Sequence, residues 1–325
     1  MRVDVEVDFG RGLPGLHLVG LPSTSVKESE ERVRSAIRRS GFKWPRKRIT
    51  VNLAPSDVPK QGSGFDLPIA LSILGETGEI DKSDLINWVA VGELSLDGKL
   101  RSVRGGLNFA DLAQDLKIKN LIMSQENARE AAMCRGIRAY AAENLREAVE
   151  LISKQKVKSP EEFRAPQQHE RELPEVDFSD VKGQEEVKRA ALIAAAGGHN
   201  LIMLGPPGSG KTMIAKRIPS ILPDLEYASL RETMKIHSVS GLTEGGSFSS
   251  RPPFRAPHHT TSTVALIGGG SPLRPGEVSL AHNGLLFLDE LPEFRRDLLE
   301  SLRQPLEDGY VFVSRARQRA RFSCR

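Results

Sequence analysis

The feature that most constrains this sequence is a glycine-rich run between residues 201–204, an apolar run that predicts a strand, and a segment that predicts a helix. The run matches the pattern G-x-x-x-x-G-K-[ST], whose glycines let the backbone curl so that N–H groups point at phosphate oxygens. An ordinary glycine-rich turn is the alternative, but the complete match and both flanks favour a nucleoside-triphosphate site. The residues expected to bind the nucleotide are Gly205, Pro206, Pro207, Gly208, Ser209, Gly210, Lys211 and Thr212.

Two side chains of this run have distinct expected roles. Lys211 would reach the β- and γ-phosphates as a point charge, and the Thr212 hydroxyl would hold Mg²⁺. We expect a helix to begin at Lys211, so that its positive dipole end faces the same phosphates. The run therefore predicts binding of a nucleoside triphosphate with its magnesium ion.

Length and composition place few limits on this site. A chain of 325 residues suggests two domains or one large one, and its 39% hydrophobic and 27% charged residues are typical of a globular protein. No apolar run approaches the ~18 residues of a membrane span, and no signal core opens the chain, so we expect a cytoplasmic protein with no membrane partner. Two cysteines cannot form a disulfide framework, and a net charge of +4 permits nucleic acid without requiring it.

The hydrophobic periodicity divides the chain into two α/β blocks. In the first block we expect extended structure over 1–22, a helix from Ser23 or Ser25 to Gly41, a strand over 48–53 and a helix over 66–74. Asp97-Gly98 between two apolar runs predicts a β-hairpin. Few apolar residues occur over 153–176, which is typical of a linker, and the second block begins at Asp177.

Paired carboxylates complement the phosphate loop. Leu285 to Leu288 form an apolar run that predicts a strand, and Asp289 and Glu290 follow it directly. Asp289 would hold the Mg²⁺ hydration shell, and Glu290 would polarise the attacking water as general base. The alternative is a strand that ends in surface acids. Together with the phosphate loop, the pair predicts an ATPase or GTPase, with Lys211, Asp289 and Glu290 as catalytic residues and Thr212 and Asp289 as metal ligands.

The segment before the loop favours adenine over guanine. Gly183 and Gln184 precede a helix expected to end near Ala196, and this arrangement resembles AAA+ proteins, in which such a loop lies against adenine. No N-K-x-D guanine motif occurs. We therefore expect ATP and Mg²⁺ as cofactors.

The segments 251–261, 267–277 and 279–284 are similar to those of the magnesium-chelatase-like AAA+ proteins of the ComM/YifB type. The resemblance implies an insertion near the pore of a hexameric ring and an ATP-driven motor on DNA, a helicase of branch migration during natural transformation. Arg251, Arg255 and Arg274 would meet the phosphodiester backbone in the central channel. A metal site at His258, His259 and His282 is disfavoured, because no cysteine or carboxylate lies at ligand spacing. A polar loop that contacts neighbours or substrate is favoured instead.

The first block resembles the Lon protease domain in outline, through 59–66, 91–94 and 105–108. Lon uses a Ser–Lys dyad, but Gly64 stands at the nucleophile position, with Ser63 adjacent, and Asn108 stands at the lysine position. An amide cannot act as a base, so proteolysis is disfavoured. The resemblance implies the non-proteolytic Lon-like domain, of the ribosomal S5 domain 2-like fold, that the ComM/YifB family carries ahead of its motor.

The predicted α/β architecture is a Lon-like domain over 1–152, a linker over 153–176 and an incomplete P-loop AAA+ core over 177–325. The core would end after the Asp289–Glu290 strand and a helix over 293–306, before sensor 1, the arginine finger and the lid. The arginine-dense end, 315–325, has a weak strand pattern and suggests a truncation or frameshift. We expect weak ATP binding and slow or absent hydrolysis. The alternatives are the ATPase subunit of a metal chelatase and a non-catalytic ATP-binding or regulatory fragment.

Overall fold

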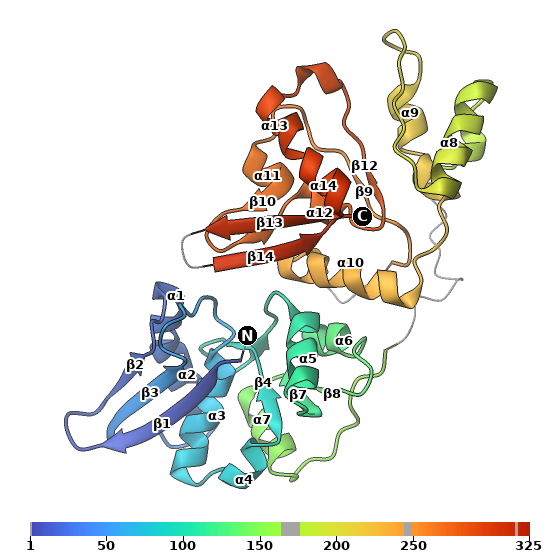
Figure 1. The fold of residues 1–325 in the computed structure, drawn as a ribbon. Helices are drawn as coiled ribbons and strands as arrows, with labels where there is room; N and C mark the ends of the chain where they lie inside the picture. The colour runs from blue at the N-terminus through green and yellow to red at the C-terminus, as the bar shows by residue number, and fades with distance from the viewer. Residues whose placement is uncertain (1, 164–175, 244–248, 316–317) are drawn as a thin grey trace. The chain divides into compact units, whose positions relative to one another are not determined.

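The computed structural model describes residues 2–163, 176–243, 249–315 and 318–325, and Figure 1 shows their fold. Two compact units appear. The first contains the described residues up to Phe163 together with 241–243, and the second contains 176–240 and 249–325. Residues 164–175, which make up half of the predicted linker, lie outside the described residues. Each unit has its own hydrophobic core.

The first sheet of the first unit has the order β1-β3-β2. Strand β3 (Arg48–Ala54) pairs antiparallel with β1 (Asp4–Gly10) and parallel with β2 (Gly15–Val19). Exposure alternates along β1, as the alternation of valine with charged residues predicts. Helix α3 (Asp66–Thr77) packs on β1. The strand predicted over 48–53 and the helix predicted over 66–74 are thus confirmed.

The helix predicted from Ser23 to Gly41 is two helices. Ser23 precedes α1 (Thr24–Lys27), Glu28 separates it from α2 (Ser29–Arg39), and Gly41 has a φ of +84° beyond the end of α2. Glycine at such a position ends a helix without the steric cost of a Cβ. The start and the stop were therefore predicted correctly, and the break at Glu28 was not.

The second sheet is parallel, with the order β4-β7-β8. Its strands are β4 (Trp88–Ala90), β7 (Asn120–Met123) and β8 (Arg138–Ala141). The Asp97-Gly98 hairpin is confirmed, with short strands β5 (Glu93–Leu94) and β6 (Leu100–Arg101). The helices of this part are α4 (Lys82–Leu85), α5 (Gly106–Asp115), α6 (Gln125–Ala131) and α7 (Leu145–Ile152).

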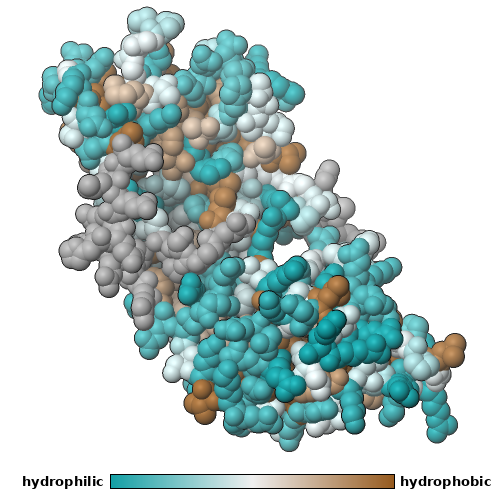
Figure 2. Space-filling model, turned by 180° about the vertical axis from the view of Figure 1, so that it is seen from behind, coloured by the Kyte–Doolittle hydropathy of each residue, from teal (hydrophilic) through white to brown (hydrophobic). Residues whose placement is uncertain are grey.

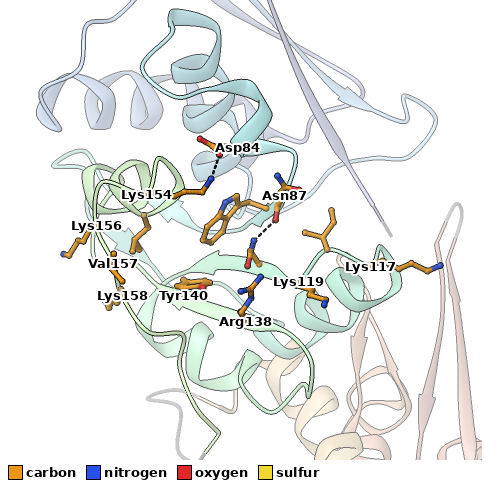
Figure 3. Close-up of a pocket in the computed structure, with 14 residues that line it drawn as sticks. Asp84, Asn87, Lys117, Lys119, Arg138, Tyr140, Lys154, Lys156, Val157 and Lys158 are labelled. Carbon is orange, nitrogen blue, oxygen red and sulfur yellow. Dashed lines mark hydrogen bonds and ion pairs between the residues drawn. The ribbon is translucent and has the colours of Figure 1, made fainter.

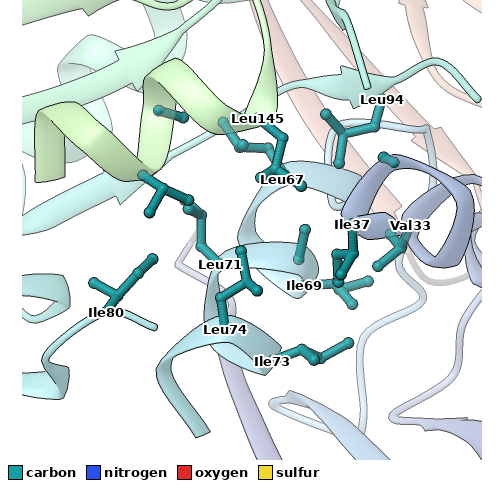
Figure 4. Packing of buried hydrophobic residues seen from close by; sticks show 14 of the residues in the cluster. Val33, Ile37, Leu67, Ile69, Leu71, Ile73, Leu74, Ile80, Leu94 and Leu145 are labelled. Atoms are coloured by element: carbon teal, nitrogen blue, oxygen red, sulfur yellow. The ribbon is translucent and has the colours of Figure 1, made fainter. Parts of the chain in front are cut away.

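The core of the first unit surrounds α3, as Figure 4 shows. Asp66, at the start of α3, is fully buried and pairs with Arg32 of α2 at 2.6 Å. Its carboxylate also accepts a hydrogen bond from the backbone N–H of Leu94, at 3.1 Å. Burial raises the pKa of Asp66, and the bonds from Arg32 oppose that rise. Asp66, in the Gly-Phe-Asp run, thus links α2, α3 and β5.

The described residues of the second unit form small hydrophobic clusters and two-stranded sheets rather than one large sheet. Phe178, Ala191 and Ile214 belong to one buried cluster. It joins η2 (Phe178–Asp180), α8 (Glu185–Gly197), α9 (Lys211–Ala215) and η3 (Ile218–Ile221). The second cluster includes Leu266, Leu298 and Val311. The remaining helices are α10 (Tyr227–Ser240), α11 (Thr263–Ile267), α12 (Glu277–Leu280), η5 (Leu291–Glu293), α13 (Arg296–Ser301) and α14 (Arg303–Asp308). The strands are β9 (Phe254–Arg255), β10 (Gly268–Gly269), β11 (Arg274–Pro275), β12 (Leu285–Leu286), β13 (Tyr310–Arg315) and β14 (Gln318–Ser323).

The apolar run before the phosphate loop is not a strand. Leu201, Ile202 and Leu204 are 38%, 70% and 88% exposed. A strand needs a hydrogen-bonded neighbour, and no strand of the described residues pairs with this segment. The other predicted strand is present but short, since only Leu285 and Leu286 of β12 pair in parallel with β9.

The end of the chain differs from its prediction in two ways. The helix predicted over 293–306 is divided into α13 and α14, because Pro305 lacks an N–H and its ring crowds the carbonyl of Ser301. The arginine-dense end, expected to be weak in strand structure, forms β14 against β13. Arg319 and Arg321 are exposed and alternate with half-buried Ala320 and Phe322, which is the period of a strand.

The face drawn in Figure 2 is mostly hydrophilic, with hydrophobic residues in small groups. Across the described residues, no helix has the length and hydrophobicity needed to cross a membrane.

Candidate functional site

The phosphate loop has the open, glycine-dependent backbone that its sequence predicts. Gly208 and Gly210 have φ angles of +80° and +88°, which residues with a Cβ rarely adopt. A Cβ added at Gly208 would meet no atom within 4 Å, so the loop borders open space. Helix α9 begins at Lys211, with Gly210 as its N-cap, as expected.

The Lys211 ammonium group is hydrogen-bonded to the backbone of this loop. Its Nζ donates to the carbonyl oxygens of Gly205 and Pro206, at 2.9 and 3.0 Å. These neutral carbonyls hold the ammonium without neutralising its charge, because no carboxylate of the described residues forms an ion pair with it. The loop therefore carries a positive charge where an anion would bind.

Thr212 and Asp289 meet beside this charge. The Thr212 hydroxyl donates to the Asp289 carboxylate at 2.7 Å, although the two residues are 77 positions apart in the chain. A hydroxyl and a carboxylate are oxygen ligands of the kind that Mg²⁺ prefers. The folding of the second unit thus brings both predicted metal ligands together.

Glu290 is placed differently from its neighbour. Its side chain is 69% exposed, its φ is +54°, and its N–H donates to the other Asp289 oxygen at 3.0 Å. A positive φ at a glutamate is uncommon and is found where function holds a strained backbone. The Nδ1 of His259 lies 3.9 Å from Glu290 Oε2. The sequence predicts a polar loop at His259 that contacts neighbours or substrate, and it does not indicate this position beside the predicted general base.

The Gly-Gln segment contacts the phosphate loop. Gly183 and Gln184 have φ angles of +65° and +59°, and Gln184 Nε2 donates to the carbonyl of Ser209 at 3.3 Å. This contact joins the predicted adenine segment to the loop. A hollow of about 570 Å³ is lined by 177–179, Val181 and residues of α8 and η3, and no residue of the phosphate loop lines it.

The three predicted nucleic-acid contacts have different surroundings. Nε and Nη2 of Arg255 donate to the two carboxylate oxygens of Glu277, at 2.6 and 2.8 Å, which neutralises the arginine in this arrangement. Arg274 is exposed in β11 and forms no ion pair with the described residues, whereas Arg251 is partly buried. Of the three, Arg274 presents the most accessible charge.

His282 is a structural residue. It is 1% exposed, its Nε2 lies 3.2 Å from Glu232, and its Nδ1 accepts from the backbone N–H of Arg325 at 3.1 Å. The rings of His258 and His259 are in contact, with centroids 4.0 Å apart and planes tilted by 35°. Among the described residues, no three His, Cys, Asp or Glu side chains gather closely enough to hold a metal ion.

Comparisons with known proteins match both units. The profile of a family described as "Magnesium chelatase, subunit ChlI" matches residues 177–325. A second profile, described as "Subunit ChlI of Mg-chelatase", matches residues 5–127. Lon protease 2 of Bacillus subtilis is 25% identical over 220 residues, which cover 65% of this chain and 35% of that protein.

Two relatives that match nearly the whole of this chain are more similar to it. Competence protein ComM of Haemophilus influenzae is 46% identical over 327 residues, which cover 99% of this chain and 64% of the relative. The protein YifB of Escherichia coli is 43% identical over 324 residues, which cover 99% of this chain and 63% of the relative. The chain thus spans slightly less than two thirds of the length of these relatives. It belongs to the ComM/YifB family of magnesium-chelatase-like proteins.

Proposed function

We propose that the second unit binds ATP with Mg²⁺ and that the protein is an ATP-driven motor acting on DNA. The observation that carries the nucleotide site is the 2.7 Å contact between Thr212 and Asp289. It joins the end of the phosphate loop to the paired carboxylates, so Thr212 and Asp289 would hold Mg²⁺, which would neutralise phosphate charge.

The residues of the site have separable roles in this proposal. Lys211 would exchange its bonds to the loop carbonyls for the β- and γ-phosphate oxygens, which carry full negative charge. Thr212 and Asp289 would hold Mg²⁺, which neutralises phosphate charge when it is bound. Gln184 would fix the segment that faces adenine through its bond to Ser209.

Glu290 would orient the attacking water. Its exposed carboxylate forms no ion pair with a lysine or arginine of the described residues, and His259 Nδ1 lies 3.9 Å from it. Its N–H bond to Asp289 fixes the backbone that carries it. His259 would limit the positions of the Glu290 carboxylate and thereby act as a positioning residue.

The DNA-acting part of the proposal rests on family membership and on exposed basic residues. The Haemophilus influenzae relative is named a competence protein, which connects it with DNA uptake. Arg274 offers an exposed cation for a phosphodiester backbone, and Arg251 and Arg255 would join it in a ring of six subunits. Branch migration during transformation is the specific motor activity we propose.

A second candidate is the ATPase subunit of a metal chelatase, because both family profiles carry that description. The same nucleotide site would then drive insertion of a metal into a tetrapyrrole by a separate catalytic subunit. The two functions differ in what stimulates ATP turnover: DNA for the motor, and the catalytic subunit with tetrapyrrole for the chelatase. The non-catalytic fragment is the third possibility, and it predicts binding without turnover.

ATP binding and turnover by the 325-residue chain test these proposals, with and without single-stranded and forked DNA. We expect weak nucleotide binding that needs Lys211. DNA-stimulated turnover that both Lys211→Ala and Glu290→Gln abolish would support the motor. Lys216→Ala is the matched control, since Lys216 is the next lysine along the chain and lies outside the loop. Unchanged ATP affinity in Lys211→Ala would overturn the nucleotide site. Binding without turnover would support the fragment.

A further inference from the structure

A hollow of about 600 Å³ lies in the first unit, at the amino ends of its three parallel strands. Trp88, Asn120 and Arg138 begin β4, β7 and β8, and the pairing of these strands places them side by side. The hollow is of the size that ligand-binding clefts have. Figure 3 draws Tyr140 and Arg138 between two groups of lysines, Lys117 and Lys119 on one side and Lys154, Lys156 and Lys158 on the other.

The charge of the hollow is strongly positive. Six cationic side chains line it, with Asp84 as the one carboxylate among the residues that do so. Lys154 pairs with Asp84 at 3.1 Å, and Lys156 and Lys158 share Glu147, at 2.8 and 3.3 Å. The remaining cations, Lys117, Lys119 and Arg138, are exposed and form no ion pair with any described residue. Three charges are therefore available for an anion.

Aromatic rings lie within the same hollow. The centroids of Trp88 and Tyr140 are 5.0 Å apart, with the ring planes tilted by 55°. Both residues line the hollow and are partly exposed, so a flat ligand can reach them. A site that combines stacking surfaces with unpaired cations suits a base and its phosphate better than it suits a purely anionic or purely apolar ligand.

Two of the lysines occupy backbone positions that favour glycine. Lys117 and Lys154 have φ angles of +58° and +57° and follow the ends of α5 and α7. Each position carries the two backbone bonds of a Schellman cap, including Ile118 N–H to Ala113 O and Gln155 N–H to Glu150 O. A cation at a helix C-terminus has a favourable dipole interaction, but Arg or Lys can provide it from the last turn without the left-handed backbone. Both lysines instead line the hollow.

We propose that this hollow binds the nucleotides of a single-stranded nucleic acid, with bases against Trp88 and Tyr140 and phosphates against Lys119, Arg138 and Lys117. The site adds to the DNA-acting function proposed above, on which its biological meaning rests. Its residues are separate from the phosphate loop. A free nucleotide carries the same two chemical groups and is the second source that the experiment must distinguish.

The test uses the full chain in a Lys211→Ala background with EDTA, so that the phosphate loop and Mg²⁺ contribute nothing. A short fluorescent oligothymidylate reports affinity by anisotropy, and Trp88 reports stacking in a Trp44→Phe variant, since the chain has two tryptophans. We expect the oligonucleotide to quench Trp88. Lys119→Gln/Arg138→Gln should weaken binding about tenfold and reduce the salt slope by about 1.4 for the two charges removed. Trp88→Leu should weaken binding roughly tenfold through lost stacking.

Matched variants separate the site from general charge and from folding. Lys27→Gln/Lys99→Gln removes two exposed charges elsewhere in the first unit and should leave affinity within about twofold. Lys117→Gly/Lys154→Gly suits the left-handed backbone, so it should keep or raise the melting temperature while it weakens binding. An equal loss of oligonucleotide affinity in Lys119→Gln/Arg138→Gln and in Lys27→Gln/Lys99→Gln would overturn the proposal. A lack of Trp88 quenching would also overturn it.

Competitors identify the ligand. Thymidine monophosphate that displaces the oligonucleotide only at much higher concentration supports a strand as the natural ligand. Equal potency supports the same site with a free nucleotide as its ligand. Displacement by polyglutamate as effective as by oligothymidylate would show that charge alone governs binding, and it would overturn the role of the aromatic pair. ATP binding by the phosphate loop, measured separately with Mg²⁺ in the unmodified chain, remains informative whichever result is obtained.

Discussion

The hydroxyl of Thr212 donates a hydrogen bond to the carboxylate of Asp289 across 77 positions of sequence, at 2.7 Å. This bond joins two segments whose strands are short or absent. The two halves of the proposed nucleotide site come together through packing around Ile214 and Leu285 rather than through an extensive sheet. The first prediction concerns this bond.

Asp289→Asn should reduce the Mg²⁺-dependent part of ATP affinity about tenfold or more, because an amide oxygen is a weaker ligand than a carboxylate. ATP binding in EDTA should change little. Titration with a fluorescent ATP analogue, with and without Mg²⁺, measures both. Asp308→Asn, at the end of α14, is the control with the same change of charge. Equal losses with and without Mg²⁺ would contradict a metal-ligand role.

Loss of the Asp66 carboxylate should destabilise the first unit more than loss of any other single carboxylate in it. Replacing it with asparagine leaves Arg32 partly buried without its ion pair, and loss of one partner of a buried pair typically costs about 3–5 kcal/mol. We expect the urea midpoint of the first unit to fall sharply in Asp66→Asn. Asp97→Asn changes an exposed carboxylate of the hairpin and should have little effect. A small effect at Asp66 would mean that the Arg32 pair contributes little to stability.

The second unit should lose stability in mild acid. Burial lowers the pKa of both His237 and His282 from the usual 6.5, despite the bonds that Leu280 O and Glu232 form with them. A histidine whose folded pKa is lowered binds protons more readily when unfolded. Its contribution to stability is therefore present above pH 6.5 and is lost as the pH falls through the lowered value. Arg255 and Arg325 add to the effect by repelling a protonated ring.

Thermal unfolding between about pH 7.5 and pH 5 measures this dependence. The wild-type transition of the second unit should move down as the pH falls, and His237→Gln/His282→Gln should flatten the curve even if it lowers stability at every pH. A double variant with an unchanged slope would assign the acid sensitivity to other groups.

Cys324 should react slowly with alkylating reagents. Burial raises the pKa of its thiol to about 11, so little thiolate is present at neutral pH. Mass spectrometry after brief maleimide treatment near pH 7 should find Cys324 largely unmodified, and urea should make it reactive. Rapid modification of the folded chain would show that the segment after β14 opens readily.

Sequence reasoning predicted much of the first unit because its signals are local. The valine alternation of β1, the Asp97-Gly98 turn and the glycine after α2 act within a few residues. It failed where a tertiary partner or a single proline decides the outcome. The segment 201–204 has a strand composition but no neighbouring strand among the described residues, and Pro305 divides a helix.

The same division holds for the candidate site, where residues of local motifs were predicted and residues brought together by the fold were not. Lys211, Thr212 and Asp289 follow from motifs, because the chemistry restricts the residue types at fixed spacing. Their mutual distance was an inference from the pattern, and the fold provides it. The place of His259 beside Glu290 and the Trp88–Tyr140 hollow come from residues distant in sequence and belong to no motif, so no sequence signal could have found them.

The exposed segment 201–204 leads directly into the phosphate loop, and this position couples two equilibria. Any strand that pairs with Leu201, Ile202 and Leu204 would bury their side chains and fix the residue before Gly205. A more rigid loop loses less entropy when it closes on phosphate, so strand pairing would raise nucleotide affinity. Reciprocity then requires that bound nucleotide strengthen the pairing by the same factor. A few exposed apolar side chains would thus link the proposed nucleotide affinity thermodynamically to strand addition.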